Sequence, residues 1–216
     1  MRFVRQVSCV GCLCTVAGIA NAGTVLHFND ITSNNVADAA IAESQLFVDV
    51  SGAGPNQALF TFFNVGLDAS SITDVYFDDG SLLALADLID ADQNSGDLGV
   101  NFSQLASPPN LPGGNTLTPA FQTTEGFLAD SNPPVQPNGV NPGESLGVLF
   151  DLKAGQTVVD VLNELDTGAL RIGIHVQGFA SGGSESLVNA PGPVPLPASA
   201  GLAGAGLLAI LARRRR

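Results

Sequence analysis

The strongest constraint on the fold is a strict alternation of apolar and polar residues over positions 170–177. The apolar positions are Leu170, Ile172, Ile174 and Val176, and the positions between them are Arg171, Gly173, His175 and Gln177. Successive side chains of a β-strand point to opposite faces, so this pattern predicts a strand with one buried face. His175 is then expected on the outward face of that strand.

Several other segments share this β character. Strands are predicted over 45–50, 58–65, 72–77 and 144–152, which are rich in β-branched and aromatic residues. The segments 107–115 and 130–143 are rich in Pro, Gly and Asn and are expected to be long loops. Many short strands joined by such loops predict a mainly β fold, an antiparallel β-sandwich of jelly-roll-like form.

One short helix is expected within this β fold, over Val158–Asp166. Thr157 followed by Asp160 matches a capping box in which an acidic residue replaces the usual Glu. Gly168 stands where a C-terminal helix cap belongs.

The N-terminus has the organisation of a secretory signal peptide. Arg2 and Arg5 precede a short apolar run, and small residues close the segment at Ala20–Ala22. We predict removal of residues 1–22 by signal peptidase, with cleavage between Ala22 and Gly23. A buried N-terminal helix fits less well, because the apolar run is short and a polar, strand-like stretch follows.

The three cysteines, Cys9, Cys12 and Cys14, all lie in the segment predicted to be removed. The exported body therefore has no disulfide and depends on core packing. Acylation of one cysteine, as in a lipoprotein, is an alternative, but Gln6 stands where a Leu-like residue is needed three positions before Cys9.

The charge of the body excludes nucleic acid as a partner. Six of the eight basic residues lie at the two ends of the chain, which leaves Lys153 and Arg171 against twenty acidic residues, a net charge of about −18. Such a charge repels nucleic acid and anionic lipid and attracts cations.

The C-terminus has three consecutive features. Val194-Pro195-Leu196-Pro197-Ala198 is followed by an apolar stretch over 198–212 and by four arginines at 213–216. As a helix, this stretch would span roughly 22 Å, against about 30 Å for the bilayer core. The arginines predict a cytoplasmic end and a body outside the membrane.

This three-part tail resembles the VPLPA variant of the PEP-CTERM sorting signal of Gram-negative bacteria, also labelled an ice-binding protein C-terminal domain. The resemblance implies processing by an exosortase, a membrane cysteine transpeptidase that cuts near the motif and releases or transfers the body to the cell surface or exopolysaccharide matrix. Leu196 replaces the glutamate of the commoner Pro-Glu-Pro form. The alternative is a permanent C-terminal membrane anchor.

The segment 90–97 is a candidate calcium site. Asp90, Asp92, Asn94 and Asp97 place oxygen ligands at nearly alternate positions, as calcium loops do. It departs from an EF-hand, because position 12 of the loop is Asn101, which has no carboxylate. The alternative is an acidic turn exposed to solvent.

The sequence gives little support for a catalytic site or for an aromatic platform that would stack on a sugar. Gly143–Gly147 matches G-x-S-x-G around Ser145, but an apolar strand is expected after the serine, where a nucleophile elbow needs a helix. No catalytic residue is therefore assigned. Sugar stacking has thin support, because the chain lacks Trp and has only Tyr76.

These observations predict five regions: a signal peptide (1–22), an extracytoplasmic β-sandwich (23–190), a Pro-rich linker with the sorting motif (191–197), a transmembrane sorting helix (198–212) and a cytoplasmic arginine cluster (213–216). The expected function is that of a non-enzymatic structural or adhesive protein of the cell surface or exopolysaccharide matrix. A calcium-dependent extracellular binding module is the alternative.

Overall fold

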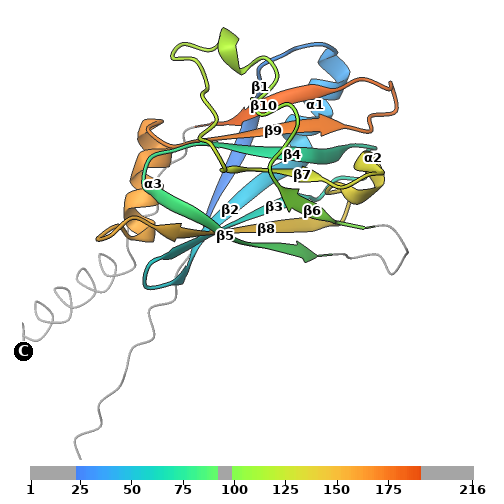
Figure 1. Ribbon diagram of the computed structural model, residues 1–216. Coiled ribbons are helices and arrows are strands. Elements are labelled where there is room, and N and C mark those ends of the chain that lie inside the picture. The colour runs from blue at the N-terminus through green and yellow to red at the C-terminus, as the bar shows by residue number, and fades with distance from the viewer. Residues whose placement is uncertain (1–22, 92–98, 191–216) are drawn as a thin grey trace, which may run out of the picture.

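The computed structural model describes residues 23–91 and 99–190 of the chain (Figure 1). Ala22 and the rest of the predicted signal peptide, the motif Val194–Ala198 and the segment 198–216 lie outside the described residues. Asp92, Asn94 and Asp97 of the predicted calcium loop lie outside them as well. Within the described ranges, no helix is long and apolar enough to cross a membrane.

The described residues form a mainly antiparallel β structure. Its strands are β1 (Thr24–Asp30), β2 (Leu46–Gly54), β3 (Gln57–Asn64), β4 (Ser71–Asp78), β5 (Leu82–Ala91), β6 (Phe102–Gln104), β7 (Leu128–Ser131), β8 (Ser145–Leu152), β9 (Arg171–Gln177) and β10 (Glu185–Asn189). The predicted strands correspond to β2, β3, β4, β8 and β9. The expected loop at 130–143 is wrong at its start, where Asp130 and Ser131 belong to β7.

All ten strands join one nearly closed sheet in the order β5-β8-β3-β2-β1-β10-β9-β4-β7-β6. β1 pairs with β2 through Thr24–His27 and with β10 through Phe28–Asp30. We call the strands from β5 to β1 half A, and those from β10 to β6 half B. The sequence predicted the antiparallel β class, and the structure shows one continuous sheet bent at β1.

Three α-helices lie among the described residues: α1 (Val36–Gln45), α2 (Val135–Asn138) and α3 (Val158–Thr167). A single 3₁₀ turn, η1, spans Gly114–Thr116. The helix predicted at 158–166 is α3, with the capping box of Thr157 and Asp160 present and Gly168 in the left-handed conformation (φ 74°).

The expectation of one helix is wrong, because α1 and the short α2 are present as well. Much of α1 is alanine, which favours helix but gives little apolar periodicity in the sequence. Asn35 caps α1, accepting a hydrogen bond from the Ala37 amide at 2.9 Å.

Phenylalanines from both halves fill the space between them. The ring of Phe77 on β4 lies 5.1 Å from Phe60 on β3 and 4.7 Å from Phe150 on β8, both in edge-to-face geometry. Phe127 reaches Phe150 at 5.2 Å. Such pairs add to the stabilisation from burial of their apolar area, so this cluster joins half A to half B.

The outer faces of the two halves differ. On half A, Phe47 and Phe63 are only partly buried, with rings stacked 5.0 Å apart, and Val25 is 49% exposed. Most phenylalanines of the described chain are buried, and these two are exceptions.

The outer face of half B is covered by residues 105–127, here called the strap, drawn in yellow-green in Figure 1. Leu111 and Phe121 of the strap form a second apolar cluster with Tyr76, Leu128 and Val188. The strap approaches the sheet most closely at Gly173, where a Cβ atom would lie 2.7 Å from Leu111 Cδ2. This close approach explains a glycine within an otherwise regular strand.

We predict that Phe77→Ala lowers the free energy of unfolding by about 3–5 kcal/mol, because it leaves a cavity among rings of both halves. Phe63→Ala is the matched control and should cost about 1–2 kcal/mol, because its ring is already partly in water. Urea unfolding measures both. Equal losses would contradict the assignment of Phe63 to an open outer face.

Candidate functional site

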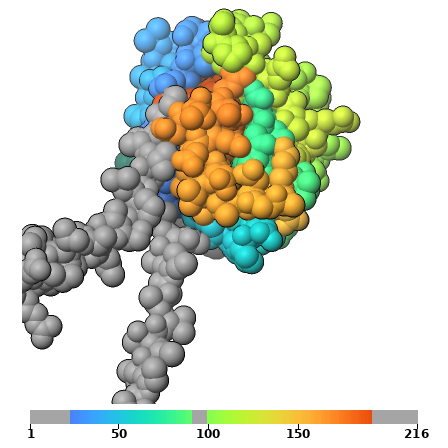
Figure 2. All heavy atoms as spheres, turned by 90° about the vertical axis from the view of Figure 1, so that its left-hand side faces the viewer, coloured from blue at the N-terminus to red at the C-terminus, as the bar shows by residue number. Residues whose placement is uncertain are grey.

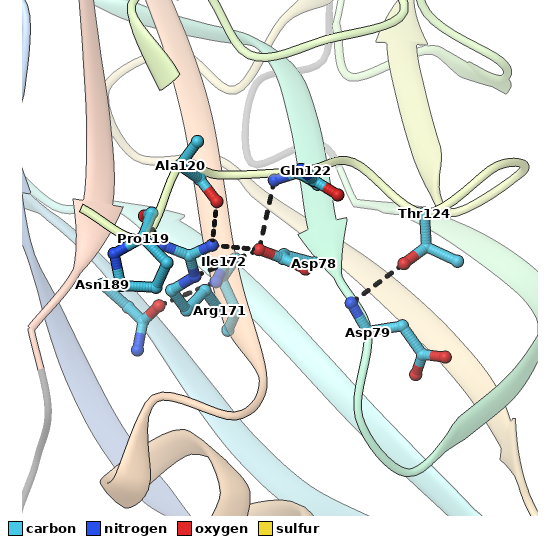
Figure 3. A network of polar contacts seen from close by, with 9 residues as sticks. All are labelled: Asp78, Asp79, Pro119, Ala120, Gln122, Thr124, Arg171, Ile172 and Asn189. Atoms are coloured by element: carbon cyan, nitrogen blue, oxygen red, sulfur yellow. Dashed lines mark hydrogen bonds and ion pairs between the residues drawn. The ribbon is translucent and has the colours of Figure 1, made fainter. Parts of the chain in front are cut away.

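Polar side chains gather at two places on the outer face of half B. The first is Arg171 at the start of β9 (Figure 3). Its Nε donates to Asp78 Oδ2 at 3.1 Å, and its Nη2 also contacts this oxygen. Its Nη1 donates to Pro119 O at 2.8 Å, and its Nη2 donates to Ala120 O at 2.6 Å. One guanidinium group thus ties β4 and β9 to the strap.

The surroundings of Arg171 complete this arrangement, which we call the arginine clasp. The Gln122 amide of the strap donates to Asp78 Oδ2 at 3.1 Å. The guanidinium lies 5.3 Å from the centroid of the Phe121 ring, within reach of a cation–π contact. The side chains of Arg171 and Asp78 are only 17% and 21% exposed, so water screens their attraction weakly.

The only other basic residue of the described chain is Lys153. Its Nζ donates to Asp79 Oδ2 at 3.0 Å and to Gly80 O at 2.6 Å, with the lysine side chain 46% exposed. Both cations of the described body are therefore paired with the consecutive acids Asp78 and Asp79.

We predict that Arg171→Met lowers the free energy of unfolding by about 3–5 kcal/mol, because Asp78 and two carbonyl groups lose their partner in a largely buried setting. Lys153→Met removes the same charge from an exposed pair and should cost about 0–1 kcal/mol. Urea unfolding of both variants measures the difference. Equal losses would show that Arg171 does not clasp the strap.

The second place is a row of polar residues across half B. Its members lie opposite one another on neighbouring strands, in the order Ser186, His175, Asp74, Asp130 and Ser103. Asp74 on β4 is 4% exposed and lies directly opposite Asp130 on β7. Its Oδ2 accepts a hydrogen bond from Thr73 Oγ1 at 2.8 Å. We call Asp74 and Asp130 the acid pair.

Burial sets the proton affinity of this row. Burial, with the nearby charge of Asp130 as a smaller cause, raises the pKa of Asp74 to about 7. The pKa of Asp130 is also raised by burial, although it accepts hydrogen bonds from Asp74 and from the Ser107 backbone. The acid pair therefore binds a proton more readily than two separate, exposed carboxylates would.

His175 lies on the outward face of β9, as its sequence pattern predicts. Its Nδ1 lies 3.0 Å from Ser186 Oγ, and burial lowers the pKa of its imidazole. Ser186 is fully buried, so it is not accessible to a substrate.

A pocket of about 370 Å³ lies beside the arginine clasp, on the side of the molecule shown in Figure 2. The residues that line it come from β1, the strap, α3, β9 and β10: Asn29–Ile31, Leu117–Pro119, Leu165, Gly168, Arg171, Val188 and Asn189. Asn189 Oδ1 accepts a hydrogen bond from the Ile172 amide at 2.7 Å, and the Asp30 carboxylate accepts from Thr32 and Ser33. These bonds orient the walls of the pocket.

The structure places few of the residues that the sequence singled out. Asp90 ends up at the end of β5, where its Oδ2 accepts from the Phe102 amide at 3.3 Å. No group of three His, Cys, Asp or Glu side chains within the described part of the chain is arranged to hold a metal ion. Calcium binding by Asp90, Asp92, Asn94 and Asp97 remains a prediction, because three of them lie outside that part.

Ser145 is the first residue of β8 and is followed by strand, as the sequence suggested for this segment. His175 belongs to β9, which is not a neighbour of β8 in the sheet. Gly23 directly precedes β1.

Sequence reasoning missed the arginine clasp and the acid pair. The clasp could have been predicted from the scarcity of basic residues, because a lone arginine in a strand of an acidic body needs an acidic partner. The acid pair gave no such signal, because Asp74 and Asp130 come from strands that are distant in sequence.

Comparison with known proteins found no matching family model, no similar curated protein and no similar solved structure.

Proposed function

We propose that this chain is an exported structural or adhesive protein of the cell surface or exopolysaccharide matrix, sorted by its C-terminal signal and processed by an exosortase. The proposal rests on the tail of Val194–Ala198, an apolar stretch and Arg213–Arg216, together with the signal peptide. The sequence is thus bounded at both ends by segments that export machinery would remove.

One structural observation supports this proposal above others. β1 begins at Thr24 and β10 ends at Asn189, and these two strands pair with each other. The Ala190 amide donates to His27 O at 2.8 Å, so the last described residue lies against β1. The first and last strands of the described body therefore hold each other in place.

The role that we propose is structural and not catalytic. The guanidinium of the arginine clasp directs its hydrogen bonds at Asp78 and at two carbonyl groups of the strap, as expected of a group that holds a surface together. The jelly-roll-like sandwich belongs to the same proposal, because the two halves face each other across the aromatic cluster.

Mass spectrometry of the exported protein tests the proposal. We expect a mature chain that starts at Gly23 and lacks Arg213–Arg216. A variant with Pro195→Ala and Pro197→Ala should start at the same residue, retain the arginines and stay in the membrane fraction. An intact Arg216 on wild-type surface protein would contradict the sorting proposal and favour a permanent anchor.

A further inference from the structure

The carboxylate of Asp49 lies against the residue that precedes β1. Asp49 is on β2, opposite Val25 on β1 and Thr61 on β3, on the outer face of half A. A Cβ atom at Gly23 would lie 2.3 Å from Asp49 Oδ1 and 2.5 Å from Asp49 Oδ2. The carboxylate therefore occupies the space beside the Cα atom of Gly23, and the backbone nitrogen of Gly23 is about 1.5 Å from that Cα atom.

Asp49 has no partner for its charge in the described part of the chain. Among the described residues, its side chain makes no hydrogen bond and no ion pair. The two basic residues of that part, Arg171 and Lys153, are paired with Asp78 and Asp79. Partial burial raises the pKa of the Asp49 carboxyl, because the charged form has lost part of its water without gaining a counterion.

The strands beside Asp49 bring no permanent positive charge either. β3 has no charged residue. The titratable residues of β1 are His27, which is exposed and packs beside Phe47, and Asp30, which lies at the far end of the strand. Nothing on the neighbouring strands therefore compensates the charge of Asp49.

Cleavage between Ala22 and Gly23 would create a cation at this place. Hydrolysis adds one water molecule across the peptide bond, so that Ala22 gains a carboxylate and Gly23 gains an amine. An α-amine has an ordinary pKa of about 7.7–8.0 and takes up a proton at neutral pH. The new ammonium group would join Lys153 and Arg171 as the third cation of a body of about −18.

We propose that Asp49 binds the α-ammonium group of the processed chain and so holds the start of β1 on β2 once the signal peptide is removed. The precursor lacks this ion pair, because the nitrogen of Gly23 is then an uncharged amide. The inference rests on the proposed cleavage between Ala22 and Gly23 and is independent of the sorting signal.

A glycine at position 23 fits this role. A side chain there would meet the Asp49 oxygens at 2.3–2.5 Å, well inside van der Waals contact. Gly23→Ala should therefore push the carboxylate away from the amine without removing either charge.

Titration of the α-amine tests the ion pair in the exported, processed protein, after mass spectrometry has established that the chain starts at Gly23. We expect ¹³C NMR of the Gly23 Cα atom to show about three- to tenfold higher proton affinity than that of an ordinary α-amine. Asp49→Asn should return the amine pKa to its ordinary range, and Gly23→Ala should lower it part of the way. Because folding raises this pKa, the pair stabilises the fold fully below about pH 7.7 and is lost as the pH rises through the raised value.

Asp87→Asn on β5 is the matched control. Asp87 is an exposed acid of the same half, separated from β2 by β8 and β3, so its removal should leave the amine pKa nearly unchanged. An equally raised pKa in wild type and Asp49→Asn would overturn the inference, because the field of the whole acidic body would then be the cause. If Asp49→Asn does not fold, Gly23→Ala replaces it, and an amine pKa unchanged by Gly23→Ala would overturn the inference.

The two proposals fail in different ways. A chain that starts at another residue would overturn the proposed cleavage site and this inference together. A chain that starts at Gly23 with an ordinary amine pKa would overturn only the ion pair with Asp49 and leave the proposed export intact.

Discussion

The pairing of β1 with two partners is the constraint on which the rest of the structure depends. Its first residues bond to β2 and its last residues bond to β10, so a single strand of seven residues belongs to both halves. Leu26 and Phe28 point inward from it, and Phe28 stacks on Phe62 with ring centroids 6.3 Å apart. Without β1, halves A and B would be two sheets with open edges, and no strand pairing of the described residues would join them.

The two cations of the described body lie close together, beside the end of β4. A body of about −18 repels itself, and its two basic residues are both paired with the consecutive acids at the end of β4. The planar guanidinium of Arg171 donates to Asp78 and to two carbonyl groups of the strap at once. The ammonium group of a lysine lacks this fixed fork of donors. At the other end of the strap, the Tyr76 hydroxyl donates to Pro108 O at 3.2 Å.

The sequence predicted what local patterns encode and missed what depends on distant partners. The alternation at 170–177 and the cap at Thr157 act over a few residues, and both are confirmed as β9 and α3. α1 was not predicted from the sequence, because its alanines give little apolar periodicity. The acid pair was not predicted either, because β7 has only four residues and because a register shift between Ile72 and Asp74 disturbs the apolar–polar alternation of β4.

Equilibrium unfolding in urea at pH 5.5, followed by two signals, tests most directly whether β1 unites the halves. Far-UV circular dichroism reports on the whole sheet, whereas Tyr76, the only tyrosine in a chain without tryptophan, reports on the outer face of half B. We predict coincident transitions with one midpoint, because half B cannot open without breaking its pairing to β1. A fluorescence transition completed at lower urea than the dichroism transition would show that half B unfolds alone and would contradict this account.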